Sequence, residues 1–393
     1  MEFQLTEEQE FFRQTVADAV DRIIMPKVED IDEHPDDFPW DVWNEFTSLG
    51  YLGLRYPEDV GGMDVDTVTA QLFYQELARA SCGFAMAVTM NMLMGTYFLH
   101  RFGNEDIINR LMIPAIQGKK IGVICFTEDQ SGTDVGATRT SATKVDGGWV
   151  INGTKNWITN GPICDFCTVI CQTDPSKGAR GLDFFLIEKG FEGFSHGQIL
   201  HKLGAQGPIT GELIFDNVFV PEDHFLGDEV GRGAQHLTDI LNEVRCMTAS
   251  QAIGITVTAL KDALEYARAR KAFGRTIGEY QLIREKFARI AAHLEAAKLM
   301  VFRTAWMIDE EKAGRGPNPR EEAFLTKWFA CEMCMTAVDE VMRIYGGNGF
   351  AREYGPQRYF RDARFLLYGG GTQEIIRDFI GGQMVKGKWQ PRL

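Results

Sequence analysis

Apolar residues recur every three or four positions through the first third of the chain. Phe12, Val16 and Val20 follow this spacing near the start, and the same spacing returns around Leu111. A period of this length places apolar side chains on one face of an α-helix. The pattern therefore predicts an all-helical domain over residues 1–120.

The pattern changes to short β-rich runs over residues 121–230. Runs such as GVICFTE, CTVICQTD and GELIFDNVFV are separated by turn residues, which is typical of strands joined by tight connections. Asp146-Gly147-Gly148 and Asn152-Gly153 predict hairpin turns, because glycine and asparagine tolerate the positive φ angles that such turns need. We expect a central β-domain here, built as a barrel or a sandwich.

Helical spacing returns in long segments from residue 231 onward. One segment covers residues 234–270 and another covers residues 318–345. Long helices with apolar faces bury those faces against each other, so residues 231–393 are expected to form a four-helix bundle. The order helix, sheet, helix places the chain in the α+β multidomain class.

Charge and hydropathy exclude two classes of partner. The net charge is -14 and the sequence pI is about 5.1, whereas binding to nucleic acid needs a concentrated basic surface. The longest apolar stretch, residues 86–98, is interrupted by Thr89, Asn91 and Gly95 and is shorter than the roughly 18 residues of a membrane helix. The acidic, amphipathic start resembles neither a secretory signal nor a transit peptide. We expect no nucleic-acid partner and no membrane span.

Eight cysteines are scattered along the chain. The two close groupings, Cys164/Cys167/Cys171 and Cys331/Cys334, lack nearby histidines that would complete a metal site. The cysteines therefore predict reduced structural thiols, a cytoplasmic protein and no bound metal.

Two segments of the middle third carry groups that suit a cofactor. Residues 125–134 join a strand to a turn of small polar residues, whose N–H groups and hydroxyls could hold a diphosphate. Residues 152–161 place Trp157 and Thr159 two positions apart, on one face of a regular strand. Taken singly, the first segment also fits a plain polar turn, and the second fits a core tryptophan beside a satisfied threonine.

Together these segments resemble the flavin-binding middle domain of acyl-CoA dehydrogenases, whose pattern is roughly T-E-P-x-A-G-S-D followed by N-G-x-K-x-W-I-T-N. The resemblance implies bound FAD. Phe126 and Thr127 would contact the edge of the isoalloxazine, Trp157 would pack on the ring, and Thr159 would bond near flavin N5. Thr133 keeps the hydroxyl of the family's loop, whereas Asp129 and Ser131 depart from its proline and alanine, and the resemblance continues through residues 202–204, 210–213 and 215–221.

The last third extends the resemblance. Residues 267–277 fit the family's R-x-x-F-G-x-x-I motif, although a solvated helix end would look the same. The family's subunits exchange flavin contacts, which implies a homotetramer built from dimers. The residues implied to reach a neighbour's FAD are Arg270, Phe273, Gln281, Gly346 and Gly347, while Thr372 and Glu374 would touch FAD within the subunit. Arg343 stands where the second exchanged motif usually has glutamine.

The expected chemistry requires a base. Removing hydrogen from Cα and Cβ of a thioester needs a carboxylate for the Cα proton, hydrogen bonds to the carbonyl and a flavin for the Cβ hydride. Most family members place this carboxylate directly before the G-T pair, eight residues after the Asp of R-D. That position is Gly370 here, so the resemblance implies a member without the usual glutamate.

A second position for the base exists in some relatives, on the long helix before an arginine that corresponds to Arg245. This position is Val244, and Glu243 lies one residue earlier, which on a helix means about 100° of rotation and about 1.5 Å of rise. Glu243 is the displaced candidate base, and a π-bulge could re-aim it. Its alternative is an ordinary helix carboxylate paired with a cation.

The resemblance also implies a substrate site. Met90 and Met94 would line an apolar acyl pocket in a segment without an arginine suited to a dicarboxylate substrate, although methionines also serve as adaptable core packing. Asn242, Arg245 and Gly371 would contact the thioester.

The implied function is α,β-dehydrogenation of an acyl-CoA, with electrons passed to an electron-transferring flavoprotein. The missing carboxylate keeps alternatives open. These are an enoyl-CoA reductase, a relative whose substrate loses another group, and a flavin- or CoA-binding protein without turnover.

Overall fold

The computed structural model describes residues 4–390. Its first helix is capped at the N-terminus by Thr6. The Thr6 side chain accepts a hydrogen bond from the Gln9 backbone N–H, and the Gln9 side chain accepts one from Thr6 in return, which satisfies two of the unpaired N–H groups of the first turn. The helices of the N-terminal part are α1 (Glu7–Ile23), α2 (Val28–Glu33), α3 (Trp40–Thr47), α4 (Thr67–Ala80), α5 (Cys82–Thr89), α6 (Tyr97–Phe102), α7 (Glu105–Ile107) and α8 (Ile113–Ile116).

One large sheet forms the middle of the chain. Its strands are β1 (Gly122–Cys125), β2 (Ser141–Val145), β3 (Gly148–Thr159), β4 (Phe166–Gln172), β5 (Leu182–Glu188), β6 (Phe194–Ile199) and β7 (Thr210–Pro221). They lie in the order β1-β4-β2-β3-β7-β6, with β5 paired to β4. Strands β4 and β5 are buried almost throughout. The expected β-domain between two helical parts is confirmed.

The two predicted hairpin turns have different outcomes. The turn at Asp146 and Gly147 joins β2 to β3, with Val145 paired to Gly148. The prediction of a turn at Asn152-Gly153 is wrong, because β3 runs through it with a bulge opposite β7. Gly153 has a φ of +150°, and a Cβ on it would lie 2.5 Å from the Thr140 Oγ1. The absence of a side chain at Gly153 therefore allows β3 to lie close to the segment that contains Thr140.

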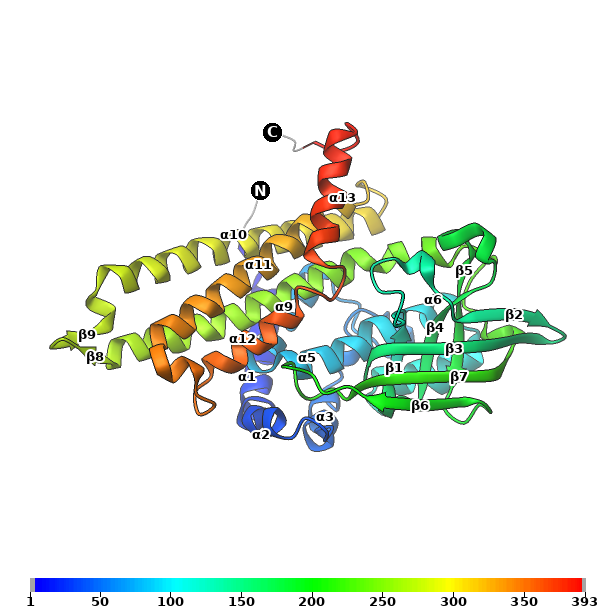
Figure 1. Cartoon of the computed structure of the whole chain (residues 1–393), viewed down its shortest axis with the longest axis horizontal. Helices are drawn as coiled ribbons and strands as arrows, with labels where there is room; N and C mark the ends of the chain where they lie inside the picture. The colour runs from blue at the N-terminus through cyan, green and yellow to red at the C-terminus, as the bar shows by residue number, and fades with distance from the viewer. Residues whose placement is uncertain (1–3, 391–393) are drawn as a thin grey trace.

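The C-terminal part consists of long helices. They are α9 (Gly233–Ala269), α10 (Gln281–Lys312), α11 (Arg320–Tyr345), α12 (Pro356–Phe365) and α13 (Gln373–Val385), with a short hairpin of β8 (Lys271–Ala272) and β9 (Arg275–Thr276) between α9 and α10. The helices predicted over residues 234–270 and 318–345 are α9 and α11. In Figure 1 the sheet lies at one end of α9 and the β8–β9 hairpin at the other.

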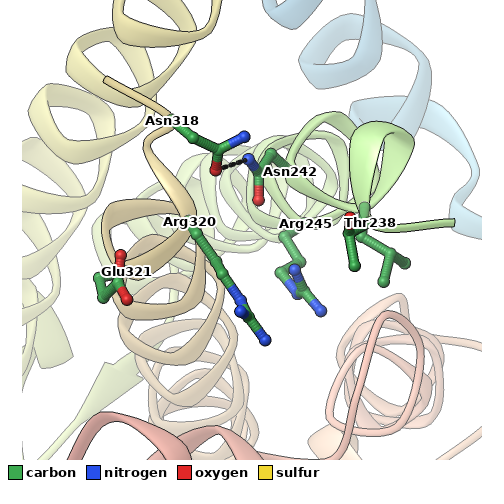
Figure 2. A pocket seen from close by; sticks show the side chains of 7 residues that line it. Thr238, Asn242, Arg245, Asn318, Arg320 and Glu321 are labelled. Carbon is green, nitrogen blue, oxygen red and sulfur yellow. Dashed lines mark hydrogen bonds between the residues drawn. The ribbon is translucent and has the colours of Figure 1, made fainter. Parts of the chain in front are cut away.

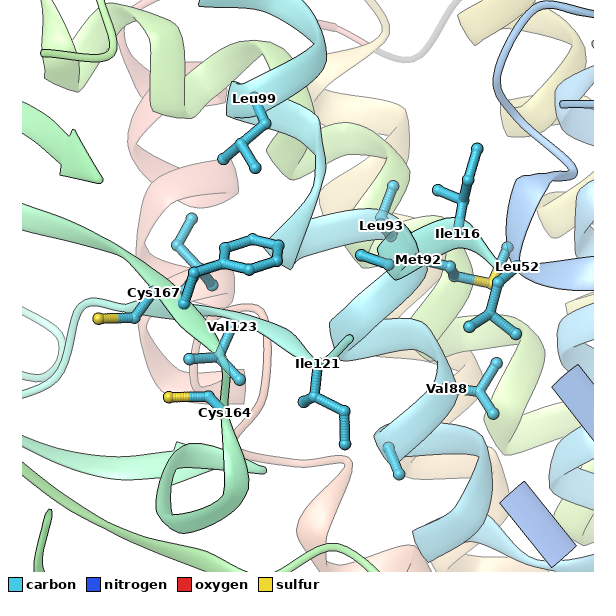
Figure 3. Close-up of a cluster of buried hydrophobic side chains, with 14 of the residues drawn as sticks. Leu52, Val88, Met92, Leu93, Leu99, Ile116, Ile121, Val123, Cys164 and Cys167 are labelled. Atoms are coloured by element: carbon cyan, nitrogen blue, oxygen red, sulfur yellow. The ribbon is translucent and has the colours of Figure 1, made fainter. Parts of the chain in front are cut away.

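A shared core joins the N-terminal helices to the sheet. Leu52, Val88 and Leu93 from the helices belong to the same buried cluster as Val123 and Cys167 from the sheet, and Figure 3 shows these side chains between the two parts. The helical segment Cys82–Phe102 is apolar and long enough to span a membrane, but 83% of its most apolar window is buried inside the protein. It therefore packs as a core helix in this fold.

Gly83 marks the closest contact between these parts. A Cβ at Gly83 would lie 1.6 Å from the backbone oxygen of Gln206, in the connection between β6 and β7. Backbone cannot move aside cheaply, so Gly83→Ala is expected to lower the free energy of unfolding by about 3 kcal/mol, the upper range for overpacking. Chemical denaturation measures this. The matched control is Gly381→Ala in α13, where nothing lies within 4 Å, and which should be neutral or slightly stabilising; equal losses in both variants would refute the packing argument.

Candidate active site

Gly370 lies in the loop of residues 369–371, which follows α12, and it comes close to Val244 and Arg245 of α9. A Cβ built on Gly370 would lie 3.8 Å from the Val244 Cγ1 and 3.7 Å from the Arg245 Cγ. Gly370 and Val244 stand at the two positions where relatives of the resembled family hold their base, and they come together here from two distant segments. Glycine and valine carry no ionisable group, so neither residue supplies a carboxylate here.

Two buried cations hold this loop. Lys327 of α11 is fully buried, and its Nζ donates to the backbone oxygens of Gly371, at 2.7 Å, and of Leu367, at 3.3 Å. The Arg245 Nε donates to the Gly370 oxygen at 3.3 Å. Burial lowers the pKa of Lys327. Because glycines have no side chains to pack, these bonds to carbonyls fix where the loop lies.

Arg245 is buried without a compensating carboxylate. Its side chain stacks on Phe324, with the guanidinium carbon 3.8 Å from the ring centroid, and the residue is 7% exposed. Burial, with a smaller contribution from the charge of Arg320, lowers the pKa of Arg245 to about 9. Over residues 4–390 no carboxylate lies within ion-pair distance of its guanidinium.

A pocket of about 340 Å³ opens beside this guanidinium. Its lining residues are Thr238, Leu241, Asn242, Arg245, Asn318, Arg320 and Glu321. Figure 2 shows Arg245 and Arg320 both extending into the opening, with Glu321 set apart from them. Asn242 donates to the Asn318 Oδ1 at 2.9 Å, and the Asn242 Oδ1 is buried without a hydrogen-bond partner. The pocket is therefore cationic and contains an unsatisfied polar atom.

Glu243 faces a different surface of α9. The Arg55 Nη2 donates to both of its carboxylate oxygens, at 3.0 and 2.9 Å, and the Lys312 Nζ lies 2.9 Å from its Oε1. Burial alone would raise the pKa of Glu243, but the charges and hydrogen bonds of Arg55 and Lys312 lower it to about 2. Such a carboxylate is a weak base, so geometry and charge favour the alternative of a paired helix carboxylate over the displaced base.

The first group of candidate flavin residues lies together at the ends of β1 and β3. Phe126 and Thr127 follow β1, and the Asn156 backbone N–H donates to the Thr127 oxygen at 2.8 Å, which brings them to Trp157 and Thr159 on β3. Beneath them the buried Lys155 Nζ donates to the Phe126 oxygen at 3.1 Å and to the Glu128 carboxylate at 2.7 Å. Thr133 lies on the exposed turn that follows.

Trp157 departs from the regular strand that the sequence predicted. It has a φ of +60° beside a register shift between Lys155 and Ile158, because a bulge turns its side chain out of the alternation. The indole is 57% exposed, whereas Thr159 is buried. Thr159 pairs with Thr210 across the sheet, and the buried Thr210 Oγ1 has no hydrogen-bond partner. The exposed indole of Trp157 could stack on a flat ring, and the unpaired Thr210 hydroxyl nearby could bond to a polar edge of that ring. A flavin has both features.

The second group lies elsewhere. Arg270 directly follows α9, Phe273 lies in the exposed β8–β9 hairpin, and Gln281 begins α10. Gly346 and Gly347 follow α11. Figure 1 places this hairpin at the end of the helices away from the sheet. Phe273 is 99% exposed and has a φ of +51°. A single chain therefore does not bring the second group to Trp157.

The remaining candidates lie near the loop and on the core helix. Thr372 caps α13 by accepting from the Ile375 N–H, and Glu374 lies in its first turn, three residues after Gly371. Met90 and Met94 lie in the π-helical segment Met90–Gly95 and pack, half-buried, against the core. Sequence reasoning missed Arg320 and Lys327. The available signal for Lys327 was a lone lysine within the apolar run FLTKWFA.

Three family models match the chain in succession. The model described as Acyl-CoA dehydrogenase, N-terminal domain, matches residues 6–119, the middle-domain model matches residues 123–218, and the C-terminal-domain model matches residues 231–385.

Known proteins match over almost the full length. A protein of Aromatoleum aromaticum named benzylmalonyl-CoA dehydrogenase is 42% identical over 98% of this chain and 100% of its own. The caffeyl-CoA reductase-Etf complex subunit CarC of Acetobacterium woodii is 32% identical over 97% of this chain and 99% of its own. The structure of butyryl-CoA dehydrogenase from Megasphaera elsdenii matches with a TM-score of 0.92 at 32% identity, covering 98% of this chain and 100% of that one.

Proposed function

The chain belongs to the acyl-CoA dehydrogenase family, and we propose that it catalyses the FAD-dependent α,β-dehydrogenation of an acyl-CoA thioester. The observation that carries this proposal is that Gly370, Val244 and Arg245 lie together, beside a pocket that Arg245 lines. It gathers at one place the segments that face the substrate's Cα in this family of oxidoreductases acting on CH–CH groups.

FAD is the proposed cofactor, and the chain's own residues fit it. Trp157 presents an exposed indole face, Thr159 and Phe126 lie at its side, and Thr372 caps the helix that follows the substrate loop. When bound, FAD supplies an oxidant that accepts a hydride from Cβ. The protein's task is to hold the thioester between Trp157's surface and α9, and to exclude water there.

We propose a homotetramer built from dimers. The support is the separation of Arg270, Phe273 and Gln281 from Trp157 within one chain, together with the exposure of Phe273. A second copy would bring these residues, with Gly346 and Gly347, to the first copy's flavin.

Electrons would pass to an electron-transferring flavoprotein, since one relative is a subunit of a complex whose name includes Etf. A cytoplasmic location is proposed on the eight cysteines, all free and buried, which suits a reducing compartment.

We propose that this member lacks the family's usual carboxylate base. Gly370 and Val244 stand at the base positions, and Glu243 is held by Arg55 and Lys312. The same absence favours a second candidate function, an enoyl-CoA reductase, which would take its Cα proton from solvent. Two relatives are named as reductases, of caffeyl-CoA and of 3-(aryl)acrylate.

The cofactor proposal predicts a yellow protein with FAD bound in each subunit. Trp157→Ala should bind FAD about tenfold more weakly or worse, because it removes an aromatic stacking surface; FAD titration of the apoprotein measures this. Trp306→Ala is the matched control, since Trp306 is 56% exposed on α10, and its FAD affinity should not change. A protein that takes up no FAD on reconstitution would defeat the proposal.

Direction and substrate are tested with thioesters in matched pairs. We choose butyryl-CoA with ethylmalonyl-CoA, and 3-phenylpropionyl-CoA with benzylmalonyl-CoA, the last because a 42% identical relative is named for it. Anaerobic bleaching of bound FAD by any of them supports oxidation. Reoxidation of the reduced enzyme by enoyl-CoA, with no bleaching by these four, would favour the reductase.

A further inference from the structure

A cationic pocket lies beside Gly370, the position where most relatives hold their catalytic carboxylate, because the Arg245 that lines it also donates to the Gly370 oxygen. The Arg245 side chain runs past Gly370, with its Cγ 3.7 Å from the position of a Gly370 Cβ, and its buried guanidinium lines the pocket with Arg320. Arg320 stacks on Phe379, with its guanidinium carbon 4.4 Å from the ring centroid. Neither guanidinium forms an ion pair with another residue of the part of the chain that the structure describes.

Two neighbouring cations without a counter-ion are electrostatically unfavourable. Burial, and to a smaller extent the charge of Arg320, lower the pKa of Arg245, because both disfavour its charged form. An anion bound between Arg245 and Arg320 would offset this cost, and guanidinium groups suit the planar, two-oxygen geometry of a carboxylate. The glycine at position 370 leaves space for such a group beside the Cα of the thioester.

We propose that Arg245, assisted by Arg320, binds a carboxylate carried on the substrate's own Cα, so that the substrate is a malonyl-type thioester that is decarboxylated as it is oxidised. This inference rests on the proposed function, because it assumes oxidation of a CoA thioester at this site. Loss of the substrate's own carboxylate then takes the place of proton removal by the catalytic base that the protein lacks.

The step balances without a protein base. The bond from Cα to the carboxylate carbon breaks, and carbon dioxide leaves. The electron pair of that bond forms the Cα=Cβ double bond, while Cβ loses a hydride to the oxidised flavin. The carboxylate's negative charge leaves with the hydride, so no proton has to be removed from Cα. Loss of carbon dioxide drives the reaction in the oxidative direction.

The phosphates of CoA are the other anions that this pocket could bind. Matched thioesters separate the two sources, because both members of a pair carry the same phosphates and only one carries the Cα carboxylate. Malonyl-CoA and acetyl-CoA are suited to binding measurements, since neither has a Cβ hydrogen that oxidation could remove.

Calorimetric titration of the FAD-loaded enzyme should show malonyl-CoA binding more tightly than acetyl-CoA. Arg245→Gln and Arg320→Gln should each lower the ratio of malonyl-CoA to acetyl-CoA affinity and so remove most of that preference, with Arg245→Gln weakening malonyl-CoA about 30-fold or more and acetyl-CoA far less. Arg320→Gln is the variant that we expect to fold normally, because Arg320 makes stacking contacts and holds no backbone carbonyl of the loop. Arg303→Gln, on the exposed side of α10, is the control for charge. Equal weakening of both thioesters would assign the arginines to the CoA phosphates and overturn the proposal.

Turnover gives an independent result. Ethylmalonyl-CoA or benzylmalonyl-CoA should bleach the flavin and release one carbon dioxide for each flavin reduced, measured with a ¹³C-labelled carboxylate. Oxidation of butyryl-CoA or 3-phenylpropionyl-CoA at a comparable rate would overturn this inference and leave the proposed function standing. Absence of bleaching by all four would overturn the proposed function itself, even if the arginines bind malonyl-CoA.

Discussion

Gly370→Glu should make the enzyme oxidise thioesters that carry no Cα carboxylate. The introduced carboxylate would stand at the position where most relatives hold their base, and a general base contributes about 10² to 10⁴-fold in rate. Flavin bleaching by butyryl-CoA or 3-phenylpropionyl-CoA should therefore rise by that order. Bleaching by their malonyl counterparts should fall steeply, because the new carboxylate would occupy the space beside Arg245 and repel the substrate's own. Stopped-flow absorbance measures both rates.

A glutamate at position 370 has room for its side chain but strains the backbone. The nearest atoms to a Cβ on Gly370 are 3.7 to 3.8 Å away, which is ordinary contact. The φ of +70° costs a non-glycine residue about 1 to 2 kcal/mol. Gly370→Gln carries the same strain and nearly the same shape without a base, so it should lose malonyl oxidation and gain nothing. If Gly370→Gln and Gly370→Glu bleach butyryl-CoA equally, the new carboxylate is not acting as a base.

Glu243→Gln should destabilise the fold strongly. The substitution leaves Arg55 buried beside α9 without its carboxylate, and breaking a buried ion pair by removing one partner costs about 3 to 5 kcal/mol. Urea unfolding of the FAD-loaded enzyme measures the loss. Asp339→Asn removes a carboxylate from an exposed pair with Arg343 and should change stability by less than about 1 kcal/mol.

The same variant decides the catalytic role of Glu243. If Glu243 takes the Cα proton, Glu243→Gln should keep FAD and thioester affinity while flavin bleaching slows by about 10² to 10⁴-fold. If Glu243 is structural, stability should fall while the folded fraction bleaches nearly as fast as the unmodified enzyme. The double variant Glu243→Gln/Arg55→Met should then regain part of the lost stability, since no unpaired cation stays buried.

The ion cluster also predicts a pH dependence. The pKa of Glu243 is lowered from 4.5 to about 2 in the folded protein. A carboxyl with a depressed folded-state pKa adds stability that is fully present above its unfolded value and is lost as pH falls toward the folded value. The stability gap between the unmodified enzyme and Glu243→Gln should therefore be constant above about pH 5 and should narrow between about pH 4.5 and pH 2.

Local periodicity was sufficient to predict the order helix, sheet, helix and two of the three longest helices, but not α10 or the contacts between distant segments. The spacing of apolar residues predicted α9 and α11 within two residues, because each helix buries a continuous face. Glu243 and Arg55 are 188 residues apart, so no local pattern could show that the candidate base was already paired. The bulges at Gly153 and Trp157 were not predicted either, because a bulge depends on the pairing with the neighbouring strand and not on the alternation along β3.

The substrate site shows a similar limit. The segment that contains Met90 and Met94 carries no arginine that could bind a second carboxylate. The cations that line the pocket come from α9 and from the start of α11, which meet only in the folded bundle. Gly370 was identifiable from the motif that follows it, but its closeness to Val244 depends on how the loop after α12 returns to α9.

The distance between the sheet and the β8–β9 hairpin links cofactor content to protein concentration. If a flavin is held partly by Trp157 of one copy and partly by Phe273 of another, dissociation of the copies removes the contacts that the second copy supplies. Mass action then makes flavin affinity fall on dilution and assembly strengthen when FAD is added. The colour of a dilute solution of this protein would thus report its association state, and a cell short of flavin would accumulate unassembled subunits.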